Sequence, residues 1–332
     1  MKKVKYILYG IVALIVLLLI AALFLPKRYD FQTSHKVEAP KTVVYNLLSN
    51  LSSRVQWDPN MNVEGINIDD RSNQKTLTWL RGEEQIKIEA EKDQNTSDLI
   101  LNRYQGKSEI PDIIKYVIKE KENNVTDVSI DYKGTSSWPM NLFNFITKRK
   151  KAKTLQMEVA AINKIAKERN ESNLYNGYKV TEDIVKEKNF ITKRDEIAKS
   201  AMQQFYVQNM GILFKEVQDA GLEMDLGMSC ALFYSEIGST ETIDMAAAIP
   251  VTEDVNIANA TSEFLKTRMA VVVDYYGDYN NTIEAHDAIK AYFDDHGYIA
   301  DIPVIEEYIT DPTKEKDPSK WLTKITYYIV GQ

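Results

Sequence analysis

The segment AVVVDYYGDYNNTIEAHDAIKAYFDDHGYIADIPVIEEYIT, residues 270–310, decides the fold of the C-terminal half of this 332-residue chain. Apolar residues fill Ala270–Tyr276 and predict a strand. Residues 282–296 place apolar side chains at helical spacing, and Gly297 follows where helices commonly end in a left-handed residue. Val304–Thr310 predicts a second strand. The segment therefore reads as strand, helix, strand.

The same order of elements occurs earlier in the chain, so residues 178–332 are predicted as one domain built from two similar units. Each unit is strand–helix–strand–strand, and two such units can pair into one antiparallel sheet with both helices on one face. The open face is expected to form a groove. The other predicted elements are strands near Lys188–Lys193, Met228–Ser235, Thr242–Val251 and Leu322–Val330, and a helix over Asp195–Ala220 stopped by Gly221.

Residues 178–331 resemble the gyrase-inhibitor-like, bacterial transcription-activator effector-binding family. The resemblance implies a groove between the two units that binds small, often cationic or aromatic molecules. It places Glu306 in that groove, two residues before Tyr308, and some relatives are hydrolases that use this glutamate with a nearby aromatic residue. The matching residues are Tyr276-Gly277-Asp278-Tyr279, Pro303-Val304-Ile305-Glu306-Glu307-Tyr308, Asp311-Pro312, Thr323-Lys324-Ile325 and Ala248-Ile249-Pro250-Val251.

The candidate ligand-binding residues share an acidic or aromatic side chain in this domain: Glu306, Tyr308, Tyr276, Tyr279, Tyr275, Phe233 and Trp321. On an alternating strand, Glu306 faces the same side as Tyr308, and Glu307 faces the other. A carboxylate among aromatic rings can bind a cation or serve as a base. The alternative for these residues is ordinary packing or solvation. His286 is predicted as a partly buried helix residue, and Cys230 as a buried, inert thiol.

The N-terminal region, residues 1–28, predicts a membrane anchor. Ile7–Leu25 contains 19 residues without a charged side chain. As a helix this run spans about 28 Å, which fits a hydrocarbon core roughly 30 Å thick. A cleaved signal peptide would have a shorter apolar core and a small-x-small cleavage site. Lysines precede the run and Lys27 and Arg28 follow it, so the positive-inside rule favours a single-pass protein with an extracytoplasmic body.

Residues 29–170 predict an α+β domain that ends in a long helix. The helix covers about Lys151–Glu168, and Leu155, Val159 and Ile162 form its apolar stripe. A short helix over Lys41–Asn50 follows the first strand. The predicted strands are Tyr29–Val37, Lys75–Arg81, Gln85–Lys92, Asp98–Gln105, Ile113–Glu120 and Thr126–Lys133.

This domain resembles the START-like, polyketide cyclase/dehydrase (SRPBCC) superfamily. The resemblance implies a helix-grip fold, a curved sheet around the long helix that often encloses an apolar cavity, and it implies no reaction. Trp57 and Trp138 are candidates for the wall or the rim of that cavity. The basic run 148–153 is predicted as a solvated helix start or as a contact for anionic lipid heads. The matching residues are Val37-Glu38-Ala39-Pro40, Val43–Leu48, Trp57-Asp58-Pro59, Val125–Val128 and Trp138–Phe143.

Composition restricts the possible cofactors and partners. One cysteine and three histidines leave no intrachain disulfide and no cysteine-rich zinc site, and no metal or other cofactor is expected. Residues 29–172 carry 22 basic and 21 acidic side chains, whereas residues 173–332 carry 14 basic and 27 acidic. An acidic C-terminal half argues against nucleic acid as a partner. The sequence gives no indication of the oligomeric state.

The sequence thus predicts a membrane-anchored small-molecule-binding protein, a sensor or carrier, of α+β class. Its parts are the anchor, residues 1–28; a START-like domain, 29–170; a linker, 171–177; and an effector-binding domain, 178–332. Two alternatives stay open: a small-molecule hydrolase with Glu306 as general base, and a non-catalytic scaffold. The anchor and the START-like domain stand where a regulator would carry its helix-turn-helix reader, which speaks against a transcriptional role.

Overall fold

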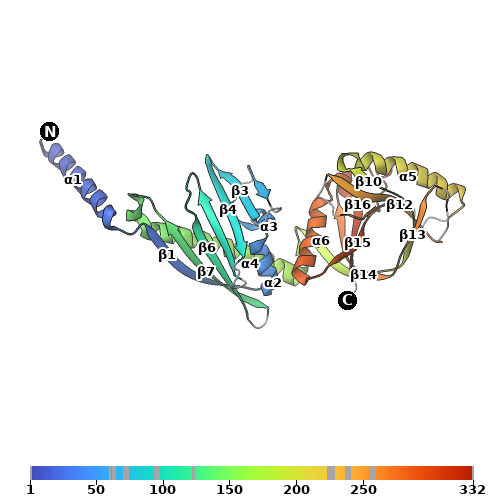
Figure 1. Cartoon of the computed structure of the whole chain (residues 1–332), viewed down its shortest axis with the longest axis horizontal. Coiled ribbons are helices and arrows are strands. Elements are labelled where there is room, and N and C mark those ends of the chain that lie inside the picture. Colours follow the sequence, from blue (N-terminus) through green and yellow to red (C-terminus); the bar gives the residue numbers. More distant parts are fainter. Residues whose placement is uncertain are drawn as a thin grey trace. The chain divides into compact units, whose positions relative to one another are not determined.

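The computed structural model describes residues 2–59, 61, 65–69, 75–92, 98–121, 124–222, 229–235, 241–253, 257 and 259–330. The chain divides into two compact units, Met1–Glu171 and Ser172–Gln332 (Figure 1). Both units combine an antiparallel sheet with helices, as the α+β prediction expects.

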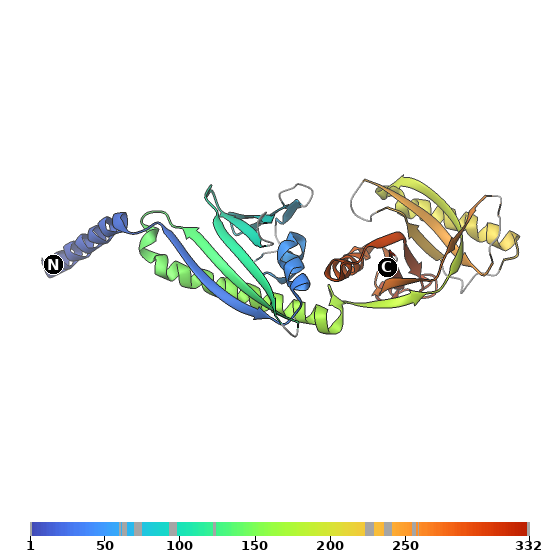
Figure 2. The same ribbon diagram turned by 60° about the horizontal axis from the view of Figure 1, so that its bottom comes forward.

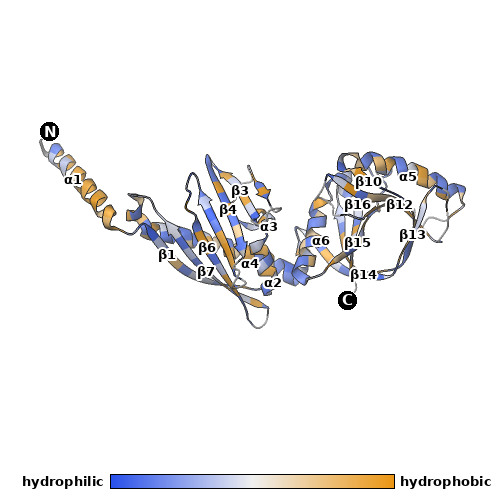
Figure 3. Cartoon of the chain, viewed as in Figure 1, coloured by the Kyte–Doolittle hydropathy of each residue, from blue (hydrophilic) through white to orange (hydrophobic). Residues whose placement is uncertain are grey.

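The first unit begins with helix α1 (Lys2–Phe24), which is long and apolar enough to cross a membrane from Val4 to Phe24. Its side chains are almost all exposed, and the apolar colour covers most of its length (Figure 3). The remaining elements are β1 (Arg28–Val37), α2 (Lys41–Ser49), α3 (Leu51–Trp57), β2 (Asn67–Asp69), β3 (Lys75–Arg81), β4 (Glu84–Lys92), β5 (Leu99–Gln105), β6 (Asp112–Lys121), β7 (Val125–Thr135), η1 (Met140–Phe143) and α4 (Asn144–Ser172).

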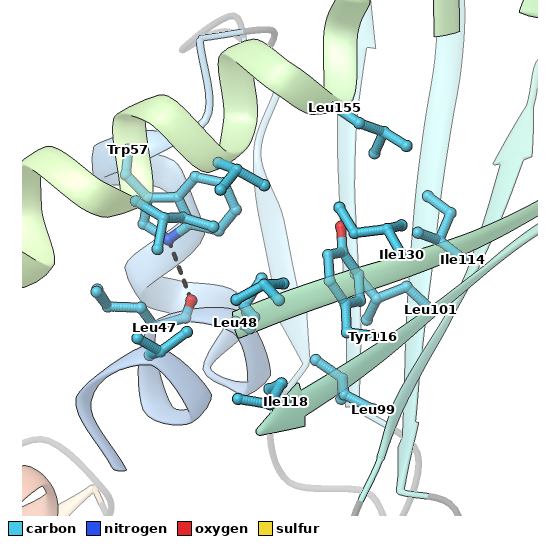
Figure 4. Packing of buried hydrophobic residues seen from close by; sticks show 14 of the residues in the cluster. Leu47, Leu48, Trp57, Leu99, Leu101, Ile114, Tyr116, Ile118, Ile130 and Leu155 are labelled. Carbon is cyan, nitrogen blue, oxygen red and sulfur yellow. Dashed lines mark hydrogen bonds between the residues drawn. The ribbon is translucent and has the colours of Figure 1, made fainter. Parts of the chain in front are cut away.

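The sheet of the first unit has seven strands in the described residues, in the order β1-β7-β6-β5-β4-β3-β2. Burial alternates along β7, where Val128, Ile130 and Tyr132 face the core and their neighbours do not. Helix α4 lies along this sheet and contributes Leu155 to the core (Figures 2 and 4). Every predicted strand of this unit is present to within a residue or two at each end.

The first unit differs from the sequence prediction in its added elements, α3 and β2, at the start of α4 and at two tryptophans. Helix α4 begins at Asn144 rather than Lys151, because the run 144–150 contains no helix breaker and its lysines and arginine favour a helix. Trp57 and Trp138, the candidates for the wall or the rim of a cavity, are not among the residues that line the cavity of this unit. Trp57 is buried and donates its indole N–H to the carbonyl of Leu47 at 3.1 Å (Figure 4). Trp138 is partly exposed and donates to the carbonyl of Leu19 at 3.2 Å.

The predicted linker, residues 171–177, is folded in the structure. Helix α4 continues to Ser172, and β8 (Leu174–Tyr175) pairs with β9 (Tyr178–Val185). Asn176 and Gly177 take positive φ angles of 50° and 84° in the turn between these strands. Turn-rich composition therefore marks a tight hairpin here rather than an extended connection.

The second unit forms a nine-stranded sheet in the described residues, in the order β13-β10-β12-β11-β15-β16-β14-β9-β8. Helix α5 follows β10, and helix α6 follows β14, so both halves of the sheet have the same succession of elements. Gly221 and Gly297, predicted as helix stops, both have a φ of 68°. The remaining elements are β10 (Lys188–Ala198), η2 (Lys199–Ala201), α5 (Met202–Asp219), β11 (Ser229–Phe233), β12 (Thr242–Val251), β13 (Thr261–Leu265), β14 (Arg268–Tyr276), η3 (Tyr279–Asn281), α6 (Ile283–His296), β15 (Ala300–Tyr308), η4 (Pro318–Lys320) and β16 (Leu322–Ile329).

The start of the helix predicted from Asp195 is wrong. Residues 195–198 extend β10 and pair with β12, where Asp195 lies opposite Met245 and Ala198 opposite Thr242. Pairing with a distant strand overrides the local preference, because strand propensity depends on its neighbours. Strands β9 and β13 are likewise additions to the predicted set. Met228, at the predicted start of β11, lies outside the described residues.

Both faces of this sheet are covered. One face packs against α5 and α6, as predicted. The other carries a second core that includes Phe190, Cys230 and Tyr328, all with no exposed surface. The sheet is curled, which encloses this face (Figure 1). Strands near its opposite edges follow one another in the chain, because β9 leads into β10 and β13 leads into β14. Glu306 and Tyr308 lie on the face of the helices, so they do not line the open-face groove that the sequence suggested.

Candidate functional site

A buried polar cluster lies between β15 and α6 in the second unit. Glu306 is 4% exposed and His286 has no exposed surface. The His286 Nε2 atom lies 2.7 Å from Glu306 Oε1, and its Nδ1 lies 2.9 Å from the Tyr327 hydroxyl. The Tyr308 hydroxyl donates to Glu306 Oε2 at 2.7 Å. Both carboxylate oxygens of Glu306 therefore accept hydrogen bonds from protein groups.

Hydrogen-bond chemistry assigns the donors in this cluster. An ionised carboxylate only accepts, so His286 Nε2 carries the hydrogen in its contact with Glu306. Burial, together with the charge of Glu306, raises the pKa of Tyr308 well above its usual value. The Tyr308 hydroxyl thus stays protonated at neutral pH and serves as a donor. The two donors hold the carboxylate in one orientation.

A row of aromatic rings runs outward from this carboxylate. The ring of Tyr308 meets Tyr206 of α5 edge-on at a centroid distance of 5.3 Å, and lies 5.0 Å from the ring of Tyr279. Tyr279 in turn stacks on Trp321 at 4.9 Å. We call Tyr206, Tyr308, Tyr279 and Trp321 the aromatic row. All four rings are partly exposed, whereas Glu306 beneath them is buried.

Local structure positions the outer members of the row. The Asp278 carboxylate accepts from the backbone N–H of Asn280 and starts the short helix η3 that carries Tyr279. The hydroxyl of Tyr279 donates to the carbonyl of Thr310. The indole N–H of Trp321 donates to the carbonyl of Glu315 at 2.9 Å. Both polar tips are thereby satisfied, so a ligand would meet these two residues through the part of each ring that remains exposed.

Four of the seven predicted site residues come together: Glu306, Tyr308, Tyr279 and Trp321. The other three lie apart from the aromatic row. Tyr275 is buried, and its hydroxyl donates to the carbonyl of Asp278. Tyr276 points to the opposite side of β14 and is 61% exposed. Phe233 is buried in the core opposite Val304.

The site contains three further residues that the sequence analysis did not assign to it: His286, Tyr327 and Tyr206. His286 is fully buried and hydrogen-bonded on both nitrogens, where a partly buried residue was expected. Its place on the apolar face of α6 was the available signal, because a buried imidazole requires partners. Tyr206 and Tyr327 carried no such signal. Cys230 is a buried thiol whose pKa burial raises, as predicted for an inert cysteine.

A second buried polar cluster occurs in the first unit. Arg54 donates to Asp58 at 2.8 Å and to Glu158 of α4 at 2.9 Å. Arg103 of β5 donates to the second oxygen of Glu158 at 3.0 Å. The side chains of Arg54 and Glu158 are at most 1% exposed. Sequence reasoning placed none of these residues in a site, and the cluster joins α3, α4 and the sheet.

The comparisons with known proteins concern mainly the second unit. Residues 178–327 match the family model described as a GyrI-like small molecule binding domain. No curated protein gives a match to the chain.

Solved structures similar to parts of the chain include the C-terminal domain of EcmrR, 20% identical, which covers 47% of this chain and 99% of that one at a TM-score of 0.42. SAV2435 bound to tetraphenylphosphonium is 14% identical, with coverages of 46% and 94% and a TM-score of 0.34. The ZhuI aromatase/cyclase from Streptomyces sp. R1128 is 11% identical, with coverages of 43% and 95% and a TM-score of 0.34. These low TM-scores establish no common function. By their family match, residues 178–327 are therefore similar to GyrI-like small-molecule-binding domains.

Proposed function

We propose that this chain is a membrane-anchored sensor or carrier whose second unit binds an aromatic cation at Glu306. The observation that carries the proposal is a buried carboxylate, 4% exposed, at the inner end of the aromatic row. Its two hydrogen-bond donors, His286 and Tyr308, hold its orientation. An acidic group in such surroundings favours a ligand that carries positive charge.

The aromatic row supplies the second half of the recognition. Aromatic faces attract cations through their quadrupole and pack against planar groups. Tyr279 and Trp321 form the outer part of the row, and Tyr308 lies between them and Glu306. A ligand would first stack on the outer rings. Its charge would then approach Glu306 through displacement of the Tyr308 ring, whose hydroxyl is bound to one oxygen of the carboxylate.

The membrane anchor belongs to the same proposal, and contacts at the end of α1 support it. Asn141, which is buried in η1, donates to the carbonyls of Ala22 at 2.7 Å and Leu25 at 3.0 Å. Around this contact large apolar side chains stay exposed: Trp138, Met140, Phe143, Phe145 and Ile146. Tryptophan and phenylalanine beside the end of a span are typical of the membrane–water interface. We place residues 138–146 in the headgroup region.

We also propose that the second unit is a duplicated effector-binding domain and that the first unit is a START-like domain. The strand succession β10-β12-β11 mirrors β14-β16-β15, which supports a duplicated effector-binding domain. In the first unit, the long helix α4 packs on a curved antiparallel sheet, which supports a START-like helix-grip domain. The ligand-binding role of Tyr275, Tyr276 and Phe233 carries less weight, since these residues lie outside the aromatic row.

A hydrolase is the second candidate, because Glu306 lies within hydrogen-bond distance of an imidazole and a phenol. Catalysis by a general base requires a free lone pair directed at water. Each oxygen of Glu306 already accepts from a protein donor and the residue is only 4% exposed, so water has little access to the remaining lone pairs, which favours binding over hydrolysis.

A thermal-shift panel on the full chain in mild detergent tests the proposed function. Aromatic cations are compared with uncharged aromatic molecules of similar size. At a concentration about 100 times Kd, a bound cation should raise the melting temperature by about 5 °C or more. Stabilisation without chemical change supports a sensor or carrier. If the compound is converted to a hydrolysis product, the second unit is an enzyme and not a sensor or carrier. If no compound in the panel stabilises the protein, the scaffold remains as the function.

A further inference from the structure

The first unit contains a cavity of about 410 Å³ between α4 and strands β3, β4 and β5. This volume lies within the usual range for small-molecule sites, about 300–1,000 Å³. The cavity belongs to neither Glu306 nor the aromatic row. Its lining residues combine basic and apolar side chains: Asp58, Trp79, Arg81, Ile86, Arg103, Gln105, Lys150, Lys151, Lys153, Thr154 and Met157.

Positive charge dominates the wall of this cavity. Five lining residues are basic and one, Asp58, is acidic. The Asp58 carboxylate is bound by Arg54, so its charge is already compensated. Lys151 pairs with Asp112. Within the described residues, the other basic side chains of the rim, Arg81, Lys150 and Lys153, make no ion pair. An anion in the cavity would therefore meet uncompensated positive charge.

Two of the lining residues each have a buried N–H donor without a hydrogen-bond partner in the part of the chain that the structure describes. They are the indole Nε1 of Trp79, a residue only 4% exposed, and the Nε of Arg103. Arg103 donates to Glu158 through its Nη2 atom, and this bond does not involve its Nε. Buried donors are nearly always paired, and an unpaired one costs about 1–3 kcal/mol. Because Trp79 and Arg103 both line the cavity, an acceptor group bound there could pair with these two donors.

The rest of the wall is apolar. The ring of Trp79 and the side chains of Ile86 and Met157 offer a surface for a hydrocarbon or aromatic body. We propose that the first unit binds a small amphipathic anion, with its sulfonate-, phosphate- or carboxylate-like head on Trp79 Nε1 and Arg103 Nε. The basic rim attracts the head, and the apolar wall holds the body. This site is separate from the proposed cation site and does not depend on it.

Calorimetric titration of the full chain in phosphatidylcholine nanodiscs tests this proposal with naphthalene-2-sulfonate and its uncharged analogue naphthalene-2-sulfonamide. The sulfonate should bind at least tenfold more tightly. Trp79→Phe keeps an aromatic ring, though a smaller one, and removes the donor, so it should weaken sulfonate binding about tenfold. The double variant Arg81→Gln, Lys153→Gln alters only exposed side chains. It should weaken sulfonate binding a few-fold and make the affinity less dependent on salt concentration.

Two matched variants serve as controls. Lys164→Gln removes an exposed charge from α4 away from the cavity, and Glu306→Gln alters the other unit; both should bind the sulfonate as the parent does. Discs that contain phosphatidylglycerol separate the sources of the anion: competition with the sulfonate assigns a lipid, and unchanged affinity assigns a soluble anion. The proposal is overturned if the sulfonate fails to bind or the sulfonamide binds equally well. It is also overturned if both the Trp79 variant and the double variant keep the parent affinity.

Discussion

Glu158→Gln is expected to lower the free energy of unfolding of the first unit by about 3–5 kcal/mol. Glu158 is 1% exposed, and its two oxygens accept from Arg54 at 2.9 Å and Arg103 at 3.0 Å. A neutral amide at this position leaves two buried guanidinium groups with one carboxylate, that of Asp58. Desolvation of an uncompensated charge makes the loss far larger than that of an exposed ion pair.

Urea unfolding of the full chain in mild detergent measures this loss. Intrinsic fluorescence reports on the first unit, because three of the four tryptophans, Trp57, Trp79 and Trp138, lie in it. Glu171→Gln is the control, since Glu171 is on the same helix but is 57% exposed, and it should change stability by less than about 0.5 kcal/mol. Equal midpoints for the Glu158 variant and the parent would show that the ionic cluster contributes no net stability.

Glu306→Gln is expected to weaken the binding of an aromatic cation tenfold to a hundredfold, about 1.4–2.8 kcal/mol. The change keeps the shape of the side chain and removes its charge. The amide oxygen can still accept from His286, and the amide N–H can donate to the Tyr308 hydroxyl, which can also act as an acceptor, so the cluster should stay folded. The loss of affinity then reports the charge of the carboxylate rather than a rearranged site.

Asp287→Asn is the matched control for this experiment. It removes the same charge from the neighbour of His286 on α6, but the Asp287 side chain is 55% exposed and points away from the cluster. Water and salt screen that charge, so the cation affinity should stay within about twofold. If both variants lose affinity equally, the effect comes from the overall charge of the acidic unit and not from Glu306.

Period-two burial made the strands of the first unit predictable from the sequence. On β7 every second residue from Thr126 to Tyr132 faces the core, and from Val128 to Tyr132 apolar and polar residues alternate in the sequence in the same way. The same signal failed at residues 195–198, where β10 continues only because β12 lies beside it. Local pattern predicts an element that carries its own hydrophobic face. A local pattern does not predict a strand segment that forms only because it pairs with a strand distant in the sequence.

In the candidate site too, contacts within one strand were predictable from the sequence, and contacts between separate elements were not. Glu306 and Tyr308 share a face because they are two residues apart on a strand, so their proximity was predictable. The contact of Glu306 with His286 depends on how α6 packs on the sheet, and that of His286 with Tyr327 depends on the position of β16. The buried cluster around Glu158 likewise joins residues more than fifty positions apart. Packing geometry, which no local pattern contains, brings these groups together.

The most direct test of the central claim measures whether the charge of Glu306 recognises the charge of the ligand. Titration calorimetry compares tetraphenylphosphonium with uncharged triphenylphosphine oxide, on the full chain and on its Glu306→Gln variant. We predict that the substitution weakens the phosphonium at least tenfold and leaves the affinity for the oxide within about twofold. Equal losses for both ligands, or no loss for either, would contradict cation recognition by this carboxylate.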